Sequence, residues 1–173
     1  MEKTLVIIKP DGVKRNLIGD IIKRFEDRGL KVAALHMVTA EEETLNKHYP
    51  LSDRDYITSL GHVDTTNMND EEKEELYQKN YKIVENLQTY MASGPVVKIV
   101  FEAENAVALV REIVGKTDPA KSPEGSIRGD LGIDSFAKAD EEHRSVENLV
   151  HASGTVDEAN QEIALWFPEV LGY

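Results

Sequence analysis

Hydrophobic positions recur along the chain with two spacings, one typical of strands and one of helices. Short apolar runs predict four strands, which are KTLVIIK (3–9), LKVAALHMV (30–38), PVVKIVFE (95–102) and LGIDSF (131–136). Apolar residues three or four positions apart predict helices over 16–29, 70–91, 104–115 and 155–167, with a shorter helix running from about 42 toward 49. Strands that alternate with helices predict an α+β sandwich with helices packed on one sheet.

Local residue patterns predict where these helices begin and end. Thr39 with Glu42, and Thr155 with Glu158, have the spacing of a capping box at a helix start. Asn69 or Asp70 is a candidate N-cap for the 70–91 helix. Glycines at 29 and 115 follow the last periodic residue and act as stop signals.

Length and composition predict a single domain covering residues 1–173. A chain of 173 residues with 40% hydrophobic positions buries about 70% of its unfolded surface in one compact unit. Two polar segments, at about 61–88 and 137–147, look like insertions that form loops or surface helices. The chain has no cysteine, which excludes disulfides, a thiolate nucleophile and a cysteine metal site.

The charge narrows the range of partners. A formal net charge of -12 disfavours nucleic acid and anionic membranes as partners, so a phosphate ligand would need a local cluster of cations. The N-terminus MEKTLVIIKPDG lacks the basic region and long apolar run of a signal peptide, and no stretch reaches membrane-spanning length. We therefore expect a cytoplasmic protein.

The stretch NLVHASGT (148–155) places His151 after a short apolar pair and before three small residues. Little bulk follows the imidazole, so it could face a cleft. Taken alone, however, the position favours a core histidine whose ring nitrogens bind neighbouring groups, because buried polar groups are usually just satisfied.

Two other segments carry cations suited to phosphate. Lys9 ends the first predicted strand ahead of a Pro-Asp-Gly turn, although lysines at strand ends are common. The loop GKTDPAKSPEGSIRGD (115–130) carries Thr117 and Arg128, and Arg111 lies one helical turn before it. These groups could converge on one anion, which arginine binds through two parallel hydrogen bonds. Each arginine could equally form a surface ion pair with one of the many acids.

Several of these segments together resemble one known family. IIKPDGVKR (7–15), the pair His48-Tyr49, SGPVV (93–97), GKTDPAKSPEGSIRGD, NLVHAS and EIALWF (162–167) occur in the order seen in nucleoside diphosphate kinases. The resemblance covers nearly the whole chain outside the two inserted segments. It favours a reactive His151 over a core histidine.

The resemblance implies a ferredoxin-like fold, with a four-stranded antiparallel sheet covered by helices. It implies a Mg²⁺-dependent enzyme that transfers the terminal phosphate of a nucleoside triphosphate to a nucleoside diphosphate through phosphorylated His151. Mg²⁺ would be held mainly by the substrate phosphates. The implied catalytic residues are His151, Glu162 and Tyr49, and the implied substrate-binding residues are Lys9, Tyr56, Leu60, Arg111, Thr117, Arg128 and Asn148. The implied assembly is a homo-oligomer, most often a hexamer.

The chain also departs from the family pattern. Gly154 stands where the family commonly has aspartate, and Ala152 where it commonly has glycine. Asp55, Tyr56 and Ile57 replace a usual Pro-Phe-Phe run. Two alternatives remain beside the kinase: a catalytically silent nucleotide-binding member of the same fold, which would have no reason to retain the full residue set, and a metal-dependent phosphohydrolase, for which the histidines lack close ligand spacing.

Overall fold

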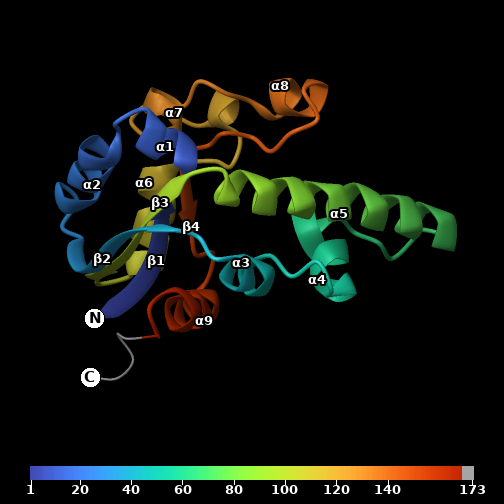
Figure 1. Cartoon of the computed structure of the whole chain (residues 1–173), viewed down its shortest axis with the longest axis horizontal. Coiled ribbons are helices and arrows are strands. Elements are labelled where there is room, and N and C mark those ends of the chain that lie inside the picture. The colour runs from blue at the N-terminus through green and yellow to red at the C-terminus, as the bar shows by residue number, and fades with distance from the viewer. Residues whose placement is uncertain (169–173) are drawn as a thin grey trace.

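A four-stranded antiparallel sheet forms the frame of the protein (Figure 1). The computed structural model describes residues 1–168; residues 169–173 of the predicted domain lie outside the described part. The strands, in the order β2-β3-β1-β4, are β1 (Glu2–Ile8), β2 (Lys31–Thr39), β3 (Pro95–Ala103) and β4 (Val150–Ala152). Helix α2 (Ile18–Glu26) connects β1 to β2, and α6 (Ala106–Val114) follows β3. This is the ferredoxin-like α+β arrangement that was predicted.

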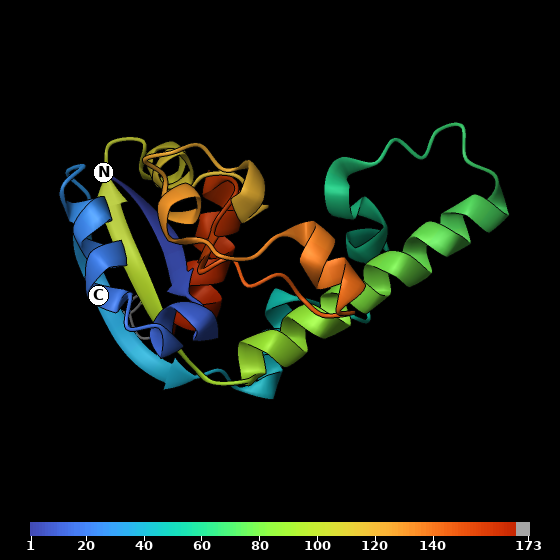
Figure 2. The same ribbon diagram turned by 90° about the horizontal axis from the view of Figure 1, so that it is seen from above.

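The central strand β1 is buried on both faces because helices cover both sides of the sheet (Figure 2). Side chains alternate along a strand. Val6 and Ile8 therefore belong to the core shared with α2 and α6, while Leu5 and Ile7 belong to the core under α9 (Val156–Trp166). This two-sided burial explains why β1 is a continuous apolar run instead of an alternating one.

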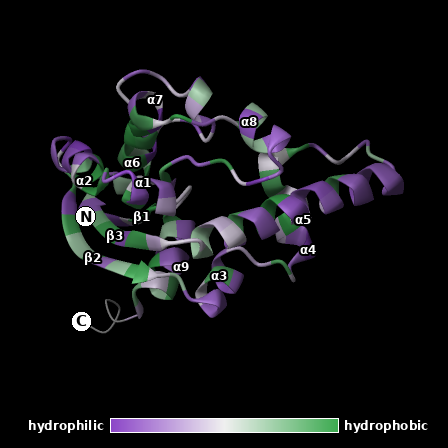
Figure 3. Ribbon diagram, turned by 45° about the horizontal axis from the view of Figure 1, so that its top comes forward, coloured by the Kyte–Doolittle hydropathy of each residue, from purple (hydrophilic) through white to green (hydrophobic). Residues whose placement is uncertain are grey.

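The remaining helices frame one end of the sheet. They are α1 (Pro10–Lys14), α3 (Glu42–His48), α4 (Arg54–Ser59), α5 (Asp70–Ala92), α7 (Ile127–Leu131) and α8 (Phe136–Glu141), with 3-10 turns at Leu60–His62 and Pro119–Lys121. The long helix α5 runs out beyond the sheet, with α4 on one side and α8 on the other (Figures 1 and 2). Its outer half is mostly hydrophilic (Figure 3). No helix in the described part of the chain is long and apolar enough to span a membrane.

The prediction of a fourth strand at 131–136 was wrong. The fourth strand is β4, which pairs with β1 and brings His151 opposite Ile7. Polar side chains explain the error: Ser135 caps α8 by accepting a hydrogen bond from the Lys138 amide, and Asp134 binds the guanidinium of Arg144. Local side-chain bonds of this kind compete with a strand ladder.

The cap predictions had mixed outcomes. Asn69 and Glu72 form a full capping box at the start of α5, and Thr155 caps α9. The Thr39–Glu42 box was wrong, because Thr39 is the last residue of β2 and pairs with Pro95.

Candidate active site

Three segments meet through side-chain hydrogen bonds at the end of β1. Lys9 directly follows β1, and its Nζ donates a 2.8 Å hydrogen bond to Oδ1 of Asn148. Asn148 in turn donates from Nδ2 to the Thr117 carbonyl at 2.9 Å. The predicted residues Lys9, Thr117 and Asn148 are therefore brought together although they are far apart in sequence.

Arg128 fixes two of these segments, the one with Asn148 and the one that begins at Gly115. Its guanidinium donates hydrogen bonds to three backbone carbonyls, those of Asn148 (3.0 Å), Gly115 (3.3 Å) and Val150 (2.6 Å). Burial, together with the charge of Arg128, lowers the pKa of Lys9 to about 7. Burial, together with the charge of Arg111, lowers the pKa of Arg128 to about 10. Two desolvated cations that repel each other create a strong local demand for an anion.

His151 sits on β4 with one edge of its ring against a carboxylate. Its Nε2 lies 2.8 Å from Oε1 of Glu162, an ion-pair contact in which an N–H on Nε2 points well away from the line to the oxygen. The hydroxyl of Ser153 donates to the other carboxylate oxygen at 2.5 Å. Burial opposes ionisation of Glu162, but the charges and hydrogen bonds of His151, His48 and Ser153 prevail and lower its pKa. An ionised Glu162 favours the Nε2–H tautomer of His151, which leaves Nδ1 with the free lone pair.

Tyr49 and His48 lie beside His151 at the end of α3. Burial raises the pKa of the Tyr49 hydroxyl well above its usual range, so it stays a neutral donor. The His48 ring lies 4.6 Å from the ring of His151, edge to face. Sequence reasoning used His48 only as part of a motif and gave it no role; its position next to Tyr49 was the one available sign.

A cavity of about 1040 Å³ opens above these groups. It is lined by Lys9, Tyr49, Arg111, Thr117, Arg128, Asn148 and His151 among others, so seven of the predicted site residues share it. Four lysines and three arginines line the cavity, while Asp140 is the single acidic residue among the described lining residues. In a chain with a net charge of -12, this is the local cation cluster that a phosphate ligand requires.

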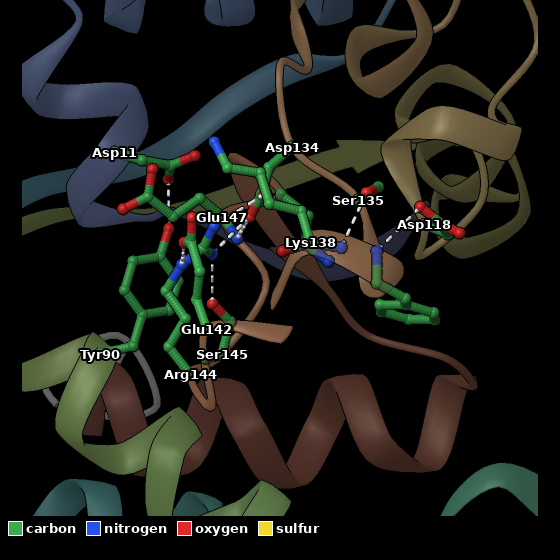
Figure 4. Close-up of polar contacts among 12 residues, drawn as sticks. Asp11, Tyr90, Asp118, Asp134, Ser135, Lys138, Glu142, Arg144, Ser145 and Glu147 are labelled. Carbon is green, nitrogen blue, oxygen red and sulfur yellow. Dashed lines mark hydrogen bonds and ion pairs between the residues drawn. The ribbon is translucent and has the colours of Figure 1, made fainter. Parts of the chain in front are cut away.

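Both inserted segments form the far wall of this cavity. Helix α5 contributes one face with Lys79, Ile83 and Leu87, and the segment around α8 contributes residues from Phe136 to Val146. The α8 segment is held by a two-pronged ion pair between Arg144 and Asp134 and by hydrogen bonds from the Phe136 amide to Asp118 and from the Glu147 amide to Asp134 (Figure 4).

The inner end of α5 is tied to the sheet beside Lys9. The Tyr90 hydroxyl donates to Asp11, which also accepts from the Leu149 amide. The Nζ of Lys9 lies 5.6 Å from the centroid of the Tyr90 ring. The far wall of the cavity is therefore anchored next to Lys9, one of the cations suited to binding phosphate.

Tyr56 and Leu60 do not line the cavity, although Tyr56 lies near the site: burial, and then the charges of Glu158 and Glu162, raise its pKa to about 12. Both pack against the core on the α9 side of the sheet, and neither is among the described residues that line the cavity. The Asn80 amide donates to the carbonyls of Ile57 and Leu60, which pins this region to α5. The apolar residues that line the cavity include Ile83 and Leu87, one turn apart on α5, and Phe136 on α8.

Gly154 has a structural explanation in Glu158. In a full capping box the Glu158 carboxylate would accept a hydrogen bond from the Thr155 amide. Here it accepts one from the Gly154 amide instead, at 2.8 Å. A Cβ at position 154 would lie 2.6 Å from Oε2 of Glu158 and 3.6 Å from a guanidinium nitrogen of Arg111. The Glu158 carboxylate therefore occupies the space that a side chain at 154 would need.

The described residues contain one cluster with the composition of a metal site, formed by His48, His151 and Glu162. Two ligand atoms on one tetrahedral ion lie about 3.3 Å apart, given metal–nitrogen distances of about 2.0 Å. Nε2 of His151 and Oε1 of Glu162 are 2.8 Å apart. That spacing favours proton sharing between the two groups over a shared metal ion.

The fold and the cavity define a class of protein: an α+β enzyme that handles phosphate groups beside a histidine. Comparison with known proteins narrows the class. The sequence model of the family described as nucleoside diphosphate kinase matches residues 2–63 and 55–170. The chain belongs to the nucleoside diphosphate kinase family, and it is accordingly a phosphotransferase.

Relatives and solved structures agree on this family. Nucleoside diphosphate kinases from Pyrobaculum aerophilum and Caldanaerobacter subterraneus are 43% and 42% identical to the chain, covering 98% and 99% of it and 96% and 97% of the relatives. A crystal structure of the Pyrobaculum kinase has a TM-score of 0.82 at 42% identity, covering 96% of this chain and 95% of that one. A Borrelia burgdorferi kinase, described as a transition state mimic with bound vanadate and ADP, has a TM-score of 0.78 at 32% identity, covering 96% and 86%.

Proposed function

We propose that this nucleoside diphosphate kinase works through a covalent intermediate on Nδ1 of His151. In the first half-reaction Nδ1 bonds to the γ-phosphorus of a nucleoside triphosphate while the bond to the β,γ-bridging oxygen breaks, and the diphosphate leaves. In the second, the terminal oxygen of another diphosphate attacks that phosphorus and restores the imidazole. The observation that carries the proposal is the contact between Nε2 and Glu162, which leaves Nδ1 as the nucleophile.

The cations of the cavity would hold the phosphates. Lys9 and Arg128 are buried and fixed by hydrogen bonds, so they can stabilise developing charge without moving. Arg111 is exposed and extends into the cavity from α6, where it can bind and release the outer phosphates. We assign Thr117 to phosphate binding, Asn148 to the ribose and the neutral Tyr49 hydroxyl to a donor role near His151.

We propose that the nucleobase lies between α5 and the α8 segment. Ile83, Leu87 and Phe136 line the cavity there. Flat apolar contact suits every nucleobase, because each has a π-face, and so it supports broad base tolerance. The stacking predicted for Tyr56 and Leu60 stays a prediction beside this assignment.

The residues of the cavity fit Mg²⁺ only as part of the substrate. Mg²⁺ prefers several oxygen ligands, and the described lining residues offer the single carboxylate of Asp140. We therefore propose that Mg²⁺ enters bound to the nucleotide phosphates, where it neutralises their charge.

We also propose a homo-oligomer, predicted to be a hexamer, built on a single domain with insertions near 61–88 and 137–147. Strand β2 is an edge strand, and it exposes Val32, Leu35 and Met37. Exposed apolar side chains on an edge strand mark a surface that another chain can cover. The family model matches the chain in two pieces that meet at 55–63, which supports an insertion close to that point. The predicted cytoplasmic location stays a prediction.

Labelling without an acceptor tests the covalent step. With radiolabelled ATP, Mg²⁺ and no diphosphate, the label should appear on His151, resist base, be lost in acid and leave when any nucleoside diphosphate is added. His151→Ala should bind nucleotide but show neither label nor transfer. The matched control is His143→Asn, a second histidine of the same cavity, which should be labelled normally; asparagine tolerates its positive φ of 52°.

Other outcomes would favour the alternatives. Nucleotide binding with neither label nor transfer would indicate a silent member of the fold. Release of inorganic phosphate at the transfer rate, without a labelled protein, would indicate a phosphohydrolase. Transfer activity that survives in His151→Ala would remove His151 from the mechanism.

A further inference from the structure

His48 is a buried titratable group that the proposed mechanism does not use. Its side chain is 2% exposed at the end of α3. Three rings surround it edge to face, those of Tyr49, His151 and Trp166, at centroid distances of 4.3, 4.6 and 5.6 Å. Trp166 lies on α9, so His48 bridges α3 and α9 directly beside the nucleophile.

Trp166 selects one tautomer of His48. The indole nitrogen can only donate a hydrogen bond, and it does so to Nδ1 of His48 at 3.3 Å. Nδ1 must therefore carry a lone pair, and the proton of the neutral ring sits on Nε2. That nitrogen is buried and has no hydrogen-bond partner among the described residues. An unpaired buried donor costs free energy, and such a group in a native fold calls for an explanation.

The explanation lies in the carboxylate that the two histidines share. Oε1 of Glu162 is 2.8 Å from Nε2 of His151 and 3.5 Å from Nδ1 of His48. A protonated His48 would carry a positive charge 3.5 Å from this oxygen and compete with His151 for it. A His48 with a lone pair on Nδ1 leaves the carboxylate to His151.

The charged groups around His48 mostly oppose its protonation. Burial is the largest effect, and the charges of His151 on β4 and Lys9 at the end of β1 act in the same direction; Glu162 on α9 opposes them. Tyr49, at the end of α3, is neutral because its pKa is raised. The net result lowers the pKa of His48 to about 3.

We infer that His48, held as the neutral Nε2–H tautomer by the Trp166 indole, is a positioning residue that reserves Glu162 for His151. The inference rests on the proposed function, in which Glu162 orients the nucleophile. It adds two residues behind Glu162, since Trp166 orients His48 and His48 protects the contact between Glu162 and His151.

Two substitutions separate this role from simple packing. Trp166→Phe keeps an aromatic ring but removes the N–H, so Nδ1 of His48 can take a proton. His48→Asn places an amide oxygen near the Nδ1 position and cannot titrate. The measured quantity is the single-turnover rate of His151 labelling by ATP from about pH 3 to 8, a range that spans both the lowered pKa of His48 and the titration of an ordinary histidine.

In Trp166→Phe the acid limb of this profile should move up by about one pH unit. In the double variant Trp166→Phe with His48→Asn, the limb should return to its position in the unaltered protein. A Trp166→Phe profile that superimposes on that of the unaltered protein would overturn the proposal, as would an upward shift that persists in the double variant.

A second measurement needs neither substrate nor activity. The Cε1–H resonance of His48 in the unaltered chain, assigned by its loss in His48→Asn, should not titrate from about pH 5 to 8 by NMR. Titration in that range would overturn the inference even if the enzyme is fully active. Failure of the proposed function would be distinguishable, because it would appear as an unlabelled His151 in the unaltered protein.

Discussion

The cavity has two walls that differ in burial. We call one the sheet-side wall, with Lys9 and Arg128, and the other the inserted wall, with Ile83 and Phe136. On the sheet side, Lys9 and Arg128 are buried, and each donates hydrogen bonds to Asn148. On the side of the inserted segments, Ile83 is 43% exposed and Phe136 41% exposed. The sheet-side wall is ordered before any nucleotide arrives, whereas the inserted wall presents apolar surface that a ligand would cover.

This difference suggests separate roles for the two walls, phosphoryl transfer for one and nucleotide binding for the other. Charge that develops during phosphoryl transfer is stabilised best by groups that need not reorganise, and the sheet-side wall has them. Apolar contact adds about 25 cal/mol per Å² buried and acts equally on the bound substrate and on the transition state. We therefore expect the sheet-side wall to govern turnover and the inserted wall to govern affinity.

The strongest test compares two arginines of the cavity. Arg128→Ala should lower kcat/KM on the order of 10³-fold. It should also lower the free energy of unfolding by about 2 to 4 kcal/mol, because two buried carbonyls and one partly buried carbonyl lose their donor. Arg111→Ala should impair binding and transfer but change the unfolding free energy by less than about 0.5 kcal/mol, because Arg111 is exposed. Steady-state kinetics and urea unfolding measure both quantities.

Equal stability losses in the two variants would contradict this contrast. So would an Arg128→Ala protein that is destabilised but retains normal turnover, since the sheet-side wall would then be structural only.

Glu162→Gln is the next largest expected effect. It should lower kcat roughly 100-fold with little change in nucleotide affinity, because Glu162 contacts His151 and Ser153 instead of the cavity. The pKa of Glu162 is lowered in the folded protein, so its charge stabilises the fold above the unfolded pKa, and this contribution is lost as the pH falls through the folded pKa. Glu162→Gln should remove this loss of folding stability at acid pH. A rise in KM with unchanged kcat would reject the orienting role.

Sequence patterns predicted the fold where burial is two-sided or periodic. β1 is a run of buried apolar residues, and α5 was predicted over 70–91 against the observed 70–92. β4 was missed because it is only three residues long. LGIDSF was a more convincing strand by composition. In the structure, however, Ser135 accepts a hydrogen bond from the Lys138 amide and Asp134 binds Arg144, and both partners are close in sequence.

The structure brings together the predicted site residues that lie in continuous family motifs, whereas the lining residues of the insertions were not predicted. Lys9, Arg128 and His151 lie in unbroken motifs, and the structure brings them to one cavity. Tyr56 and Leu60 were assigned from the residues before the insertion. Ile83 and Leu87, which line the cavity, lie within the insertion, on α5. A helical face can be predicted from sequence, but the direction in which it points depends on long-range packing.

A smaller effect should appear in the proton balance of nucleotide binding. The pKa of Lys9 is lowered to about 7 by burial and by Arg128, so above that pH its neutral form dominates in the free enzyme. Bound phosphate favours the charged form. Binding of a nucleoside diphosphate at about pH 8 should therefore take up close to one proton, and affinity should fall up to about tenfold per pH unit above 7.

Calorimetry in buffers of different ionisation enthalpy measures this uptake. Lys9→Gln should abolish it, while Lys79→Gln, at an exposed lysine on the inserted wall, should leave it unchanged. Uptake that persists without Lys9 would assign the proton to another group.

The smallest expected effects come from the inserted wall, and they sharpen the contrast most. Ile83→Ala and Phe136→Ala should each raise the KM for nucleotides about threefold to fivefold, the size expected when part of an apolar side chain no longer covers the ligand. Turnover at saturation and unfolding free energy should stay close to those of the unaltered protein, because both side chains are partly exposed. Val63→Ala is the matched control: Val63 is also 43% exposed but lies outside this cavity. Because apolar contact acts on every base alike, the rise in KM should be similar for purine and pyrimidine diphosphates. A fall in kcat instead of a rise in KM would mean that the inserted wall takes part in the chemistry, and the division between the two walls would fail.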